Sequence, residues 1–253
     1  MKKIFYSTLI FLLILFNFST VCADDVDNEV DFEDTIEVTA SNVSELPKTN
    51  SRRYIVYDRI SKSMIIGKNE DIKSAMASTT KIMTTIVILE KADLNEKVTV
   101  SAKAGGTGGS RLGLKRGDKA SVRDLLYGLM LRSGNDAAVA LAEHVGGSVK
   151  EFAELMNEKA AELGLTNTHF VTPHGLDDPN HYTTALELAK LTDYAMENET
   201  FARIVGTKST TIYINNQPRQ INNTNELLGV LNGVVGVKTG FTNNAGRCLV
   251  TET

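Results

Sequence analysis

The chain has 253 residues, of which 42% are hydrophobic and 23% are charged, and its formal net charge at pH 7 is −4. A chain of this length and composition is able to bury a sizeable core. The small net charge gives no indication of a nucleic-acid partner, so we expect none.

The N-terminus has the pattern of an export signal. Met1-Lys2-Lys3 precedes an apolar run from Ile4 to Phe18, and the small residue Ala23 precedes an acidic stretch. A short basic start followed by an apolar segment predicts a secretory signal peptide over residues 1–23 and hence an exported, extracytoplasmic protein. The run is short for a membrane span, although an uncleaved anchor is an open alternative. Cleavage after Ala23 leaves Cys248 as the single cysteine, so no internal disulfide is expected.

Residues 24–50 predict a solvated, flexible spacer. Eight acidic residues and no basic residue occur between Asp24 and Glu37. Such a block of like charge resists packing. Without those eight acids and the two signal-peptide lysines, 25 basic and 23 acidic residues remain, so the folded part carries a net charge near +2. We therefore expect one domain over residues 51–253.

Periodicity and turn residues predict a mixed α/β domain with a mainly helical portion between Ser121 and Phe201. A glycine-rich stretch over residues 105–110 indicates a flexible loop, because Arg111 occupies the last position of a G-x-G-x-x-G motif. Strands are expected over residues 53–58, 63–67, 98–100, 208–214, 234–241 and 247–251, and helices from near Ser78 to 89 and over 121–132, 136–146, 148–163 and 184–197.

The helix that begins near Ser78 carries the first candidate site. Positions three apart lie on one face of a helix, with β-carbons about 5–6 Å apart, so Lys81 is expected beside the Ser78 hydroxyl. A serine hydroxyl needs a base to become a nucleophile, and lysine serves as one only when its pKa is lowered by burial or by a neighbouring cation. The apolar run after Lys81 predicts such burial.

Two further motifs contain groups that can bind or react with a ligand. Ser133 and Asn135 lie in a polar turn between two apolar helices, where a capped turn is the simpler interpretation. Lys238-Thr239-Gly240 lies on a predicted strand and combines a cation, a hydroxyl and a glycine that permits close approach of a ligand. His169, His174 and His181 fall in a loop without the spacing of zinc ligands, so we expect solvent-facing histidines, no metal site and no cofactor.

The three motifs S-x-x-K, S-x-N and K-T-G occur once each and in this order, a set known from class A β-lactamases and penicillin-binding proteins. The chain resembles the D-alanyl-D-alanine carboxypeptidases, the low-molecular-weight penicillin-binding proteins of bacterial cell walls. The likeness runs from about Arg53 to the end of the chain. Beyond the three motifs it includes residues 131–137, 163–170, 173–177 and 236–240.

This resemblance implies a β-lactamase/transpeptidase-like fold, in which an antiparallel sheet is flanked by helices and accompanied by a mainly helical subdomain. It implies that Ser78 attacks the D-alanyl-D-alanine bond of a peptidoglycan stem peptide and forms an acyl-enzyme that water hydrolyses. Lys81 would be the base, and Ser133 would relay a proton to the leaving amine. β-Lactam antibiotics are implied as inhibitors that acylate Ser78.

The resemblance also implies how the substrate is bound. Asn135 would hold its peptide backbone, Lys238 would supply a positive field, and Thr239 would bind its terminal carboxylate. Gly240 would let the substrate approach the strand closely. The backbone amides of Ser78 and Phe241 would form the oxyanion hole.

Other functions remain as alternatives. A β-lactamase is less favoured, because the E-x-x-L-N pattern is absent between Asn135 and Lys238. A D,D-endopeptidase would use the same groups, and a non-catalytic module that binds wall peptide or penicillin is the alternative of another class. Members of the family continue beyond the position of Val250 with another strand, a covering helix and often a membrane anchor. We therefore expect a C-terminal truncation, with membrane attachment limited to an uncleaved signal or to that missing region.

Overall fold

The computed structural model describes residues 49–253. The expected signal peptide and almost all of the acidic spacer lie outside these residues. The described chain forms the 3₁₀ helix η2 (Ala77–Thr80) and the α-helices α2 (Lys81–Lys91), α3 (Ala102–Gly105), α4 (Val122–Leu131), α5 (Asn135–Gly146), α6 (Val149–Glu162), α7 (Ala185–Met196) and α8 (Glu199–Val205). Its strands are β1 (Tyr54–Asp58), β2 (Ser63–Lys68), β3 (Lys97–Thr99), β4 (Lys119–Ser121), β5 (Ser209–Ile214), β6 (Gln217–Asn222), β7 (Lys238–Thr242) and β8 (Gly246–Val250).

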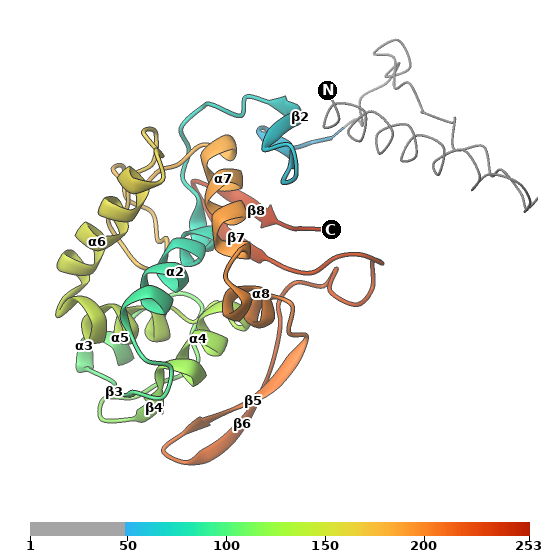
Figure 1. Ribbon diagram of the computed structural model, residues 1–253. Coiled ribbons are helices and arrows are strands. Elements are labelled where there is room, and N and C mark those ends of the chain that lie inside the picture. The colour runs from blue at the N-terminus through green and yellow to red at the C-terminus, as the bar shows by residue number, and fades with distance from the viewer. Residues whose placement is uncertain (1–48) are drawn as a thin grey trace, which may run out of the picture. The chain divides into compact units, whose positions relative to one another are not determined.

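Helix α2 is the centre of the domain (Figure 1). It contacts α4, α5, α6, α7 and α8, and every side chain from Lys81 to Ile88 is buried. The Thr84 hydroxyl lies in this interior and donates to the carbonyl of Pro173 at 2.7 Å. Burial on nearly all sides agrees with the apolar sequence of this helix. It fixes the residues at its N-terminus relative to the surrounding helices.

Three helix starts in the helical portion were predictable from their first residues. The side chains of Ser121, Ser148 and Thr184 each accept a hydrogen bond from the backbone amide three residues later, at the starts of α4, α6 and α7. Each such cap typically contributes about 1 kcal/mol to stability. The mainly helical portion between Ser121 and Phe201 is therefore confirmed.

The strands form three antiparallel sheets rather than one. Strand β1 pairs with β2, β7 pairs with β8, and a four-stranded sheet has the order β3-β4-β5-β6. The α/β class, the antiparallel pairing and the flanking helices are confirmed; in the described residues the pairing is divided over three sheets where one was expected. Strands β4 and β6 were not predicted, since β4 has three residues and β6 is polar and contains Pro218.

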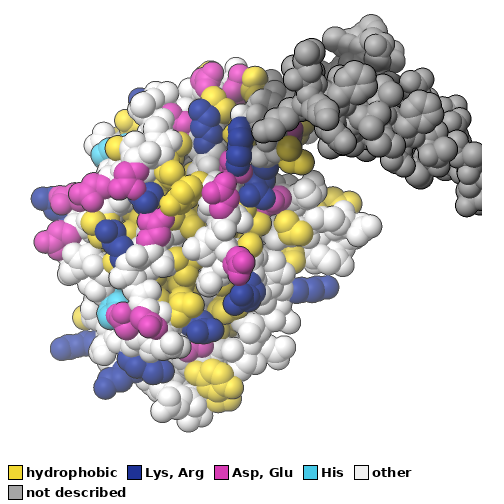
Figure 2. All heavy atoms as spheres, in the orientation of Figure 1, with side chains coloured by type: hydrophobic (Ala, Val, Ile, Leu, Met, Phe, Trp, Pro, Cys, Tyr) yellow, Lys and Arg dark blue, Asp and Glu magenta, His cyan; other side chains and the backbone are white. Residues whose placement is uncertain are grey.

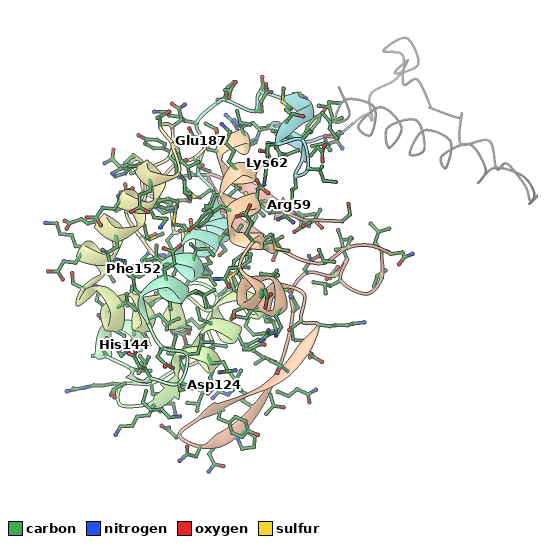
Figure 3. The ribbon with its side chains drawn as sticks, in the orientation of Figure 1. Arg59, Lys62, Asp124, His144, Phe152 and Glu187 are labelled. Carbon is green, nitrogen blue, oxygen red and sulfur yellow. The ribbon has the colours of Figure 1, made fainter. Side chains whose placement is uncertain are left out.

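The turn after β1 is attached to the helical portion by an ion-pair cluster on α7. Arg59 Nε donates to Asp193 Oδ1 at 2.9 Å, and Lys62 Nζ donates to Asp193 Oδ2 at 2.8 Å. Arg59 also pairs with Glu252, so segments far apart in sequence meet here. Arg59 and Lys62 extend towards α7 in Figure 3.

One face of the domain is mixed in charge. Figure 2 shows basic and acidic side chains interspersed over the face in view, separated by small hydrophobic groups. No helix between residues 49 and 253 is both long enough and apolar enough to span a bilayer.

Candidate active site

Ser78 and Lys81 meet at the start of the central helix. Lys81 Nζ lies 2.9 Å from Ser78 Oγ, as the spacing predicts. The local geometry differs from a simple capped helix, because Ser78 lies within a 3₁₀ turn whose N-cap residue, Met76, makes no side-chain capping bond. The turn starts at Ala77, whose φ of 48° is left-handed. The Thr79 and Thr80 hydroxyls donate to the carbonyls of Met76 and Ala77, which leaves the Ser78 hydroxyl facing Lys81.

The Lys81 amine is fully buried and has three oxygen neighbours. Besides Ser78 Oγ, these are Asn135 Oδ1 at 2.8 Å and the carbonyl oxygen of His174 at 2.7 Å. The amide and carbonyl oxygens only accept hydrogen bonds, whereas a hydroxyl either donates or accepts. A neutral amine has two protons, and the two obligate acceptors take both. Its lone pair is then directed at the Ser78 hydroxyl, which is the arrangement required of a base.

The surroundings favour this neutral form. Burial lowers the pKa of Lys81 well below its usual value, and the nearby charge of Lys238 lowers it further, while Asp136 acts in the opposite direction. The Asp136 carboxylate is itself buried and accepts hydrogen bonds from the backbone amides of Leu112, Gly113 and Leu114 at 2.8–2.9 Å. This carboxylate therefore ties the 112–114 segment to the start of α5.

Asn135 is held in one orientation by the glycine-rich loop. Its Nδ2 donates to the carbonyl of Gly108 at 2.8 Å, which turns Oδ1 towards Lys81, and its backbone amide donates to the carbonyl of Ser110 at 2.7 Å. A β-carbon at Gly109 would lie 2.6 Å from Asn135 Nδ2. The loop was predicted, but its role in orienting Asn135 was not. Asn135 was expected to hold substrate, and both ends of its amide already have partners in the protein.

Ser133 lies in the turn between α4 and α5 with a left-handed φ of 56°. Its Oγ is buried and has no hydrogen-bond partner among the described residues. A buried hydroxyl without a partner is costly unless a ligand or water completes it. The turn is therefore more than a capped connection between helices.

Strand β7 brings the third motif alongside Ser78. A β-carbon at Gly240 would lie 2.9 Å from the backbone nitrogen of Ser78, so glycine is needed for this approach. Lys238 is 1% exposed and donates to the carbonyl of Thr239 at 2.9 Å. Burial lowers the pKa of Lys238 to about 7. Phe241, the next residue after the glycine, is 64% exposed at the rim.

The prediction that the loop histidines face solvent is wrong for His174 and His181, which are buried. Nδ1 of each accepts a hydrogen bond from a backbone amide, that of Leu176 for His174 and that of Val171 for His181. His181 Nε2 lies 2.8 Å from Thr80 Oγ1, at the end of the Ser78 turn. Burial is the main cause that lowers the pKa of His174 to about 3 and that of His181 to about 4, so both rings are neutral at pH 7.

Gly175 lets the same loop lie against the Ser78 turn. Its φ is +86°, and a β-carbon there would be 1.8 Å from the carbonyl oxygen of Ala77. Only glycine fits this position. The P-H-G-L-D stretch around it contributed to the family likeness, but periodicity alone gave no indication of this contact.

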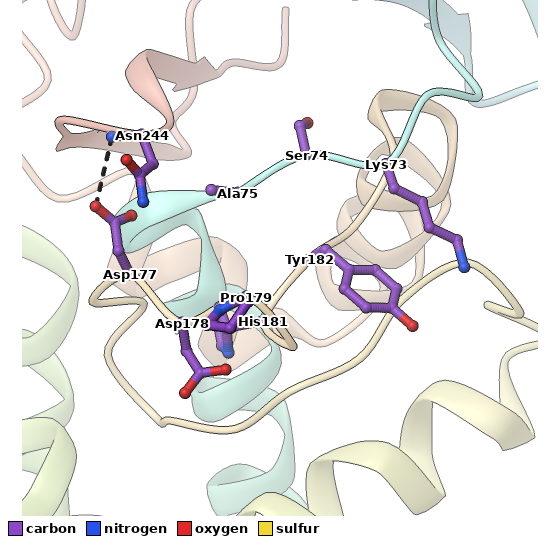
Figure 4. Close-up of a pocket in the computed structure, with 9 residues that line it drawn as sticks. All are labelled: Lys73, Ser74, Ala75, Asp177, Asp178, Pro179, His181, Tyr182 and Asn244. Atoms are coloured by element: carbon purple, nitrogen blue, oxygen red, sulfur yellow. Dashed lines mark hydrogen bonds between the residues drawn. The ribbon is translucent and has the colours of Figure 1, made fainter.

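A pocket of about 550 Å³ adjoins the site (Figure 4). Ser78 does not line it. Asp177 connects the pocket wall to β7, because the Thr242 hydroxyl donates to Asp177 Oδ1 at 2.6 Å. The lining residues are 73–75 and 177–179 with His181, Tyr182 and Asn244. Within residues 49–253, no cluster of three or more histidine, cysteine or acidic residues could hold a metal ion.

Comparison with known families gives a match over residues 39–253 to the family described as D-alanyl-D-alanine carboxypeptidase. The chain belongs to this family. The carboxypeptidase DacF of Bacillus subtilis is 38% identical over 201 residues, which are 77% of this chain and 52% of the relative. DacB2 of Mycobacterium tuberculosis is 37% identical over 207 residues, which are 81% of this chain and 71% of the relative.

Solved structures support the family fold. A serine-to-alanine mutant of the Streptomyces K15 DD-transpeptidase superposes with a TM-score of 0.78 at 36% identity, covering 82% of this chain and 87% of that one. The expected β-lactamase/transpeptidase-like fold is thus confirmed for the described residues. The chain spans about half the length of DacF and of Escherichia coli DacC, of which it covers 52% and 55%.

Proposed function

We propose that this protein is a serine D,D-carboxypeptidase that removes the terminal D-alanine from peptidoglycan stem peptides. The observation that carries the proposal is the Lys81 amine, which lies 2.9 Å from Ser78 Oγ and has obligate acceptors on its other two sides. This geometry supports Ser78 as the nucleophile and Lys81 as its base. Family membership indicates the substrate.

In the acylation step, Ser78 Oγ attacks the carbonyl between the two D-alanines while its proton passes to Lys81 Nζ. The backbone amides of Ser78 and Phe241 stabilise the developing oxyanion. Loss of one such donor typically costs about 3–4 kcal/mol of transition-state stabilisation. Ser133 relays this proton from Lys81 to the leaving nitrogen as the C–N bond breaks, so Lys81 is neutral again, free D-alanine departs and an ester on Ser78 remains. Water hydrolyses this ester and restores the serine.

The remaining groups bind the stem peptide. Thr239 donates to the terminal carboxylate, and Lys238 provides positive potential near it. Gly240 keeps β7 close to Ser78. Asn135 Nδ2 donates one proton to Gly108, and its second proton holds the substrate backbone. β-Lactams resemble the acylated dipeptide and are proposed to form a stable ester with Ser78.

The proposed location follows from the substrate, since peptidoglycan lies outside the cytoplasmic membrane. We assign residues 1–23 as the export signal, residues 24–50 as an acidic spacer and residues 51–253 as the carboxypeptidase domain.

The proposal is tested by measuring D-alanine release from an Nα-acyl-D-alanyl-D-alanine peptide. We expect the Ser78→Ala variant to lose at least about 10⁴-fold in kcat/KM, as replacement of serine nucleophiles does elsewhere. Ser209→Ala is the matched control, because Ser209 is exposed on β5, and its activity should be unchanged. Retention of most activity by Ser78→Ala would contradict the proposal.

A further inference from the structure

Thr224, which lies between β6 and β7, is close to the proposed carboxylate-binding residue. Its Oγ1 is 3.0 Å from Thr239 Oγ1. The Thr224 side chain is exposed, and that of Thr239 is half-buried, so an incoming ligand can reach both hydroxyls. The sequence motifs gave no indication of Thr224.

The backbone around Thr224 is fixed from several sides. Its amide donates to the carbonyl of Leu131, the last residue of α4, at 3.0 Å. The neighbouring Asn223 donates to the carbonyls of Val205 and Thr207. Asn225 is buried and donates to the carbonyl of Gly236, just before β7, at 2.8 Å. These bonds hold the Thr224 hydroxyl in place between the end of α4 and β7.

In this pair of neighbouring hydroxyls, either one can donate a hydrogen bond to the other. Each threonine hydroxyl has one proton and two acceptor positions. The contact between them uses one proton, so whichever hydroxyl accepts keeps its own proton free to point outward. When an anion arrives, rotation of both C–O bonds directs two donors at it. A carboxylate, with two oxygens that only accept, is the complementary ligand.

The buried amine of Lys238 is not placed to contact the carboxylate directly. Lys238 is 1% exposed, and its amine donates to the Thr239 carbonyl. The protein therefore encloses this amine, which contributes positive potential, while the two threonine hydroxyls are groups that an incoming ligand can reach.

We propose that Thr224 is a second binding residue for the C-terminal carboxylate of the substrate and acts together with Thr239. This inference rests on the proposed carboxypeptidase function, because it assumes a peptide substrate that ends in D-alanine. It assigns the preference for a free terminal carboxylate to a pair of threonines contributed by two separate segments.

The inference is tested by calorimetric binding to the Ser78→Ala variant, which binds without turnover. The two ligands are an Nα-acyl-D-alanyl-D-alanine peptide and its C-terminal amide. Adding Thr224→Val, which removes the hydroxyl at nearly constant volume, should weaken the acid peptide about tenfold, the size expected for one hydrogen bond to a charged group. Binding of the amide should change little, and Thr224→Ser should retain the preference for the acid.

Thr239→Val should also weaken the acid peptide, and the double variant should lose less than the sum of the two single losses, because the hydroxyls act as a pair. Equal weakening of acid and amide by Thr224→Val would overturn the inference, as would unchanged binding of the acid. Thr224→Ala, with an unfolding temperature like that of the parent, repeats the test if the valine disturbs packing. Failure of the proposed function would instead appear as absent D-alanine release by the unmodified chain.

Discussion

At the level of single residues, the site depends on whether the lone pair of the Lys81 amine is directed at the Ser78 hydroxyl. Asn135 Oδ1 and the His174 carbonyl occupy two sides as acceptors, and the Ser78 hydroxyl occupies the third. The orientation of Asn135 decides this arrangement, because an amide flipped by 180° would present Nδ2 to Lys81. The Gly108 carbonyl prevents the flip by accepting from Nδ2. The glycine-rich loop thus holds Asn135 in the orientation that Lys81 requires to act as the proposed base.

Gly109→Ala tests that role. The new β-carbon would lie 2.6 Å from Asn135 Nδ2, so the amide must move and Lys81 loses a partner. We expect the rate of Ser78 acylation by benzylpenicillin to fall at least about tenfold, the effect of roughly 1.4 kcal/mol on a barrier.

Gly113→Ala is the matched control for this test. Gly113 also has a φ of +80°, but a β-carbon there would meet nothing within 4 Å. It should lose about 1 kcal/mol of stability from backbone strain and keep its acylation rate. Equal acylation by the two variants would show that the loop does not orient Asn135.

At the level of elements, the loop that contains His174 and His181 stabilises the 3₁₀ turn of Ser78. Gly175 packs against Ala77, and His181 contacts the Thr80 hydroxyl. Both rings accept backbone hydrogen bonds while neutral, so protonation of either ring removes an acceptor from a buried position. Protonation of either ring therefore weakens the attachment of the loop to the Ser78 turn.

This coupling predicts a loss of stability in mild acid. Burial lowers the pKa values of the two histidines from 6.5 to about 3 and about 4. Between pH 6.5 and pH 4 the unfolded chain binds protons that the folded chain does not, so the free energy of unfolding falls as pH falls. Each histidine contributes up to about 1.4 kcal/mol per pH unit in this window.

Urea unfolding at several pH values measures the effect. His181→Asn keeps a side-chain acceptor but does not titrate, so its unfolding free energy should fall less steeply towards pH 4. At pH 7 its unfolding free energy should be lower, because the buried ring is lost. His169→Asn, with no comparable burial, is the control. The same slope in His181→Asn as in the parent protein would contradict the assignment.

At the level of the whole molecule, the site is assembled from segments far apart in sequence. The Ser78 turn, the start of α5, the loop after Pro173 and strand β7 meet at one end of α2. Local patterns predicted most of the helices and several of their caps, because an apolar stripe and a capping residue act within a few residues. The pairing of Ser78 with Lys81 was predictable for the same reason.

Other features depend on contacts that no local pattern contains. Strand β6 is polar, and it is a strand because it pairs with β5. The burial of His174 and His181 depends on a loop folding back onto the Ser78 turn. The contact of Thr224 with Thr239 requires two segments that are separate in sequence. The three motifs indicated which residues matter, while their distances and protonation states needed the fold.

The measurement that tests the account most directly is intact-mass spectrometry of the purified protein after exposure to benzylpenicillin. We predict a one-to-one covalent adduct that persists for minutes and is absent from the Ser78→Ala variant. Consumption of the antibiotic without an adduct would indicate a β-lactamase instead. An unmodified protein with the antibiotic intact would contradict the central claim that Lys81 activates Ser78 for acylation.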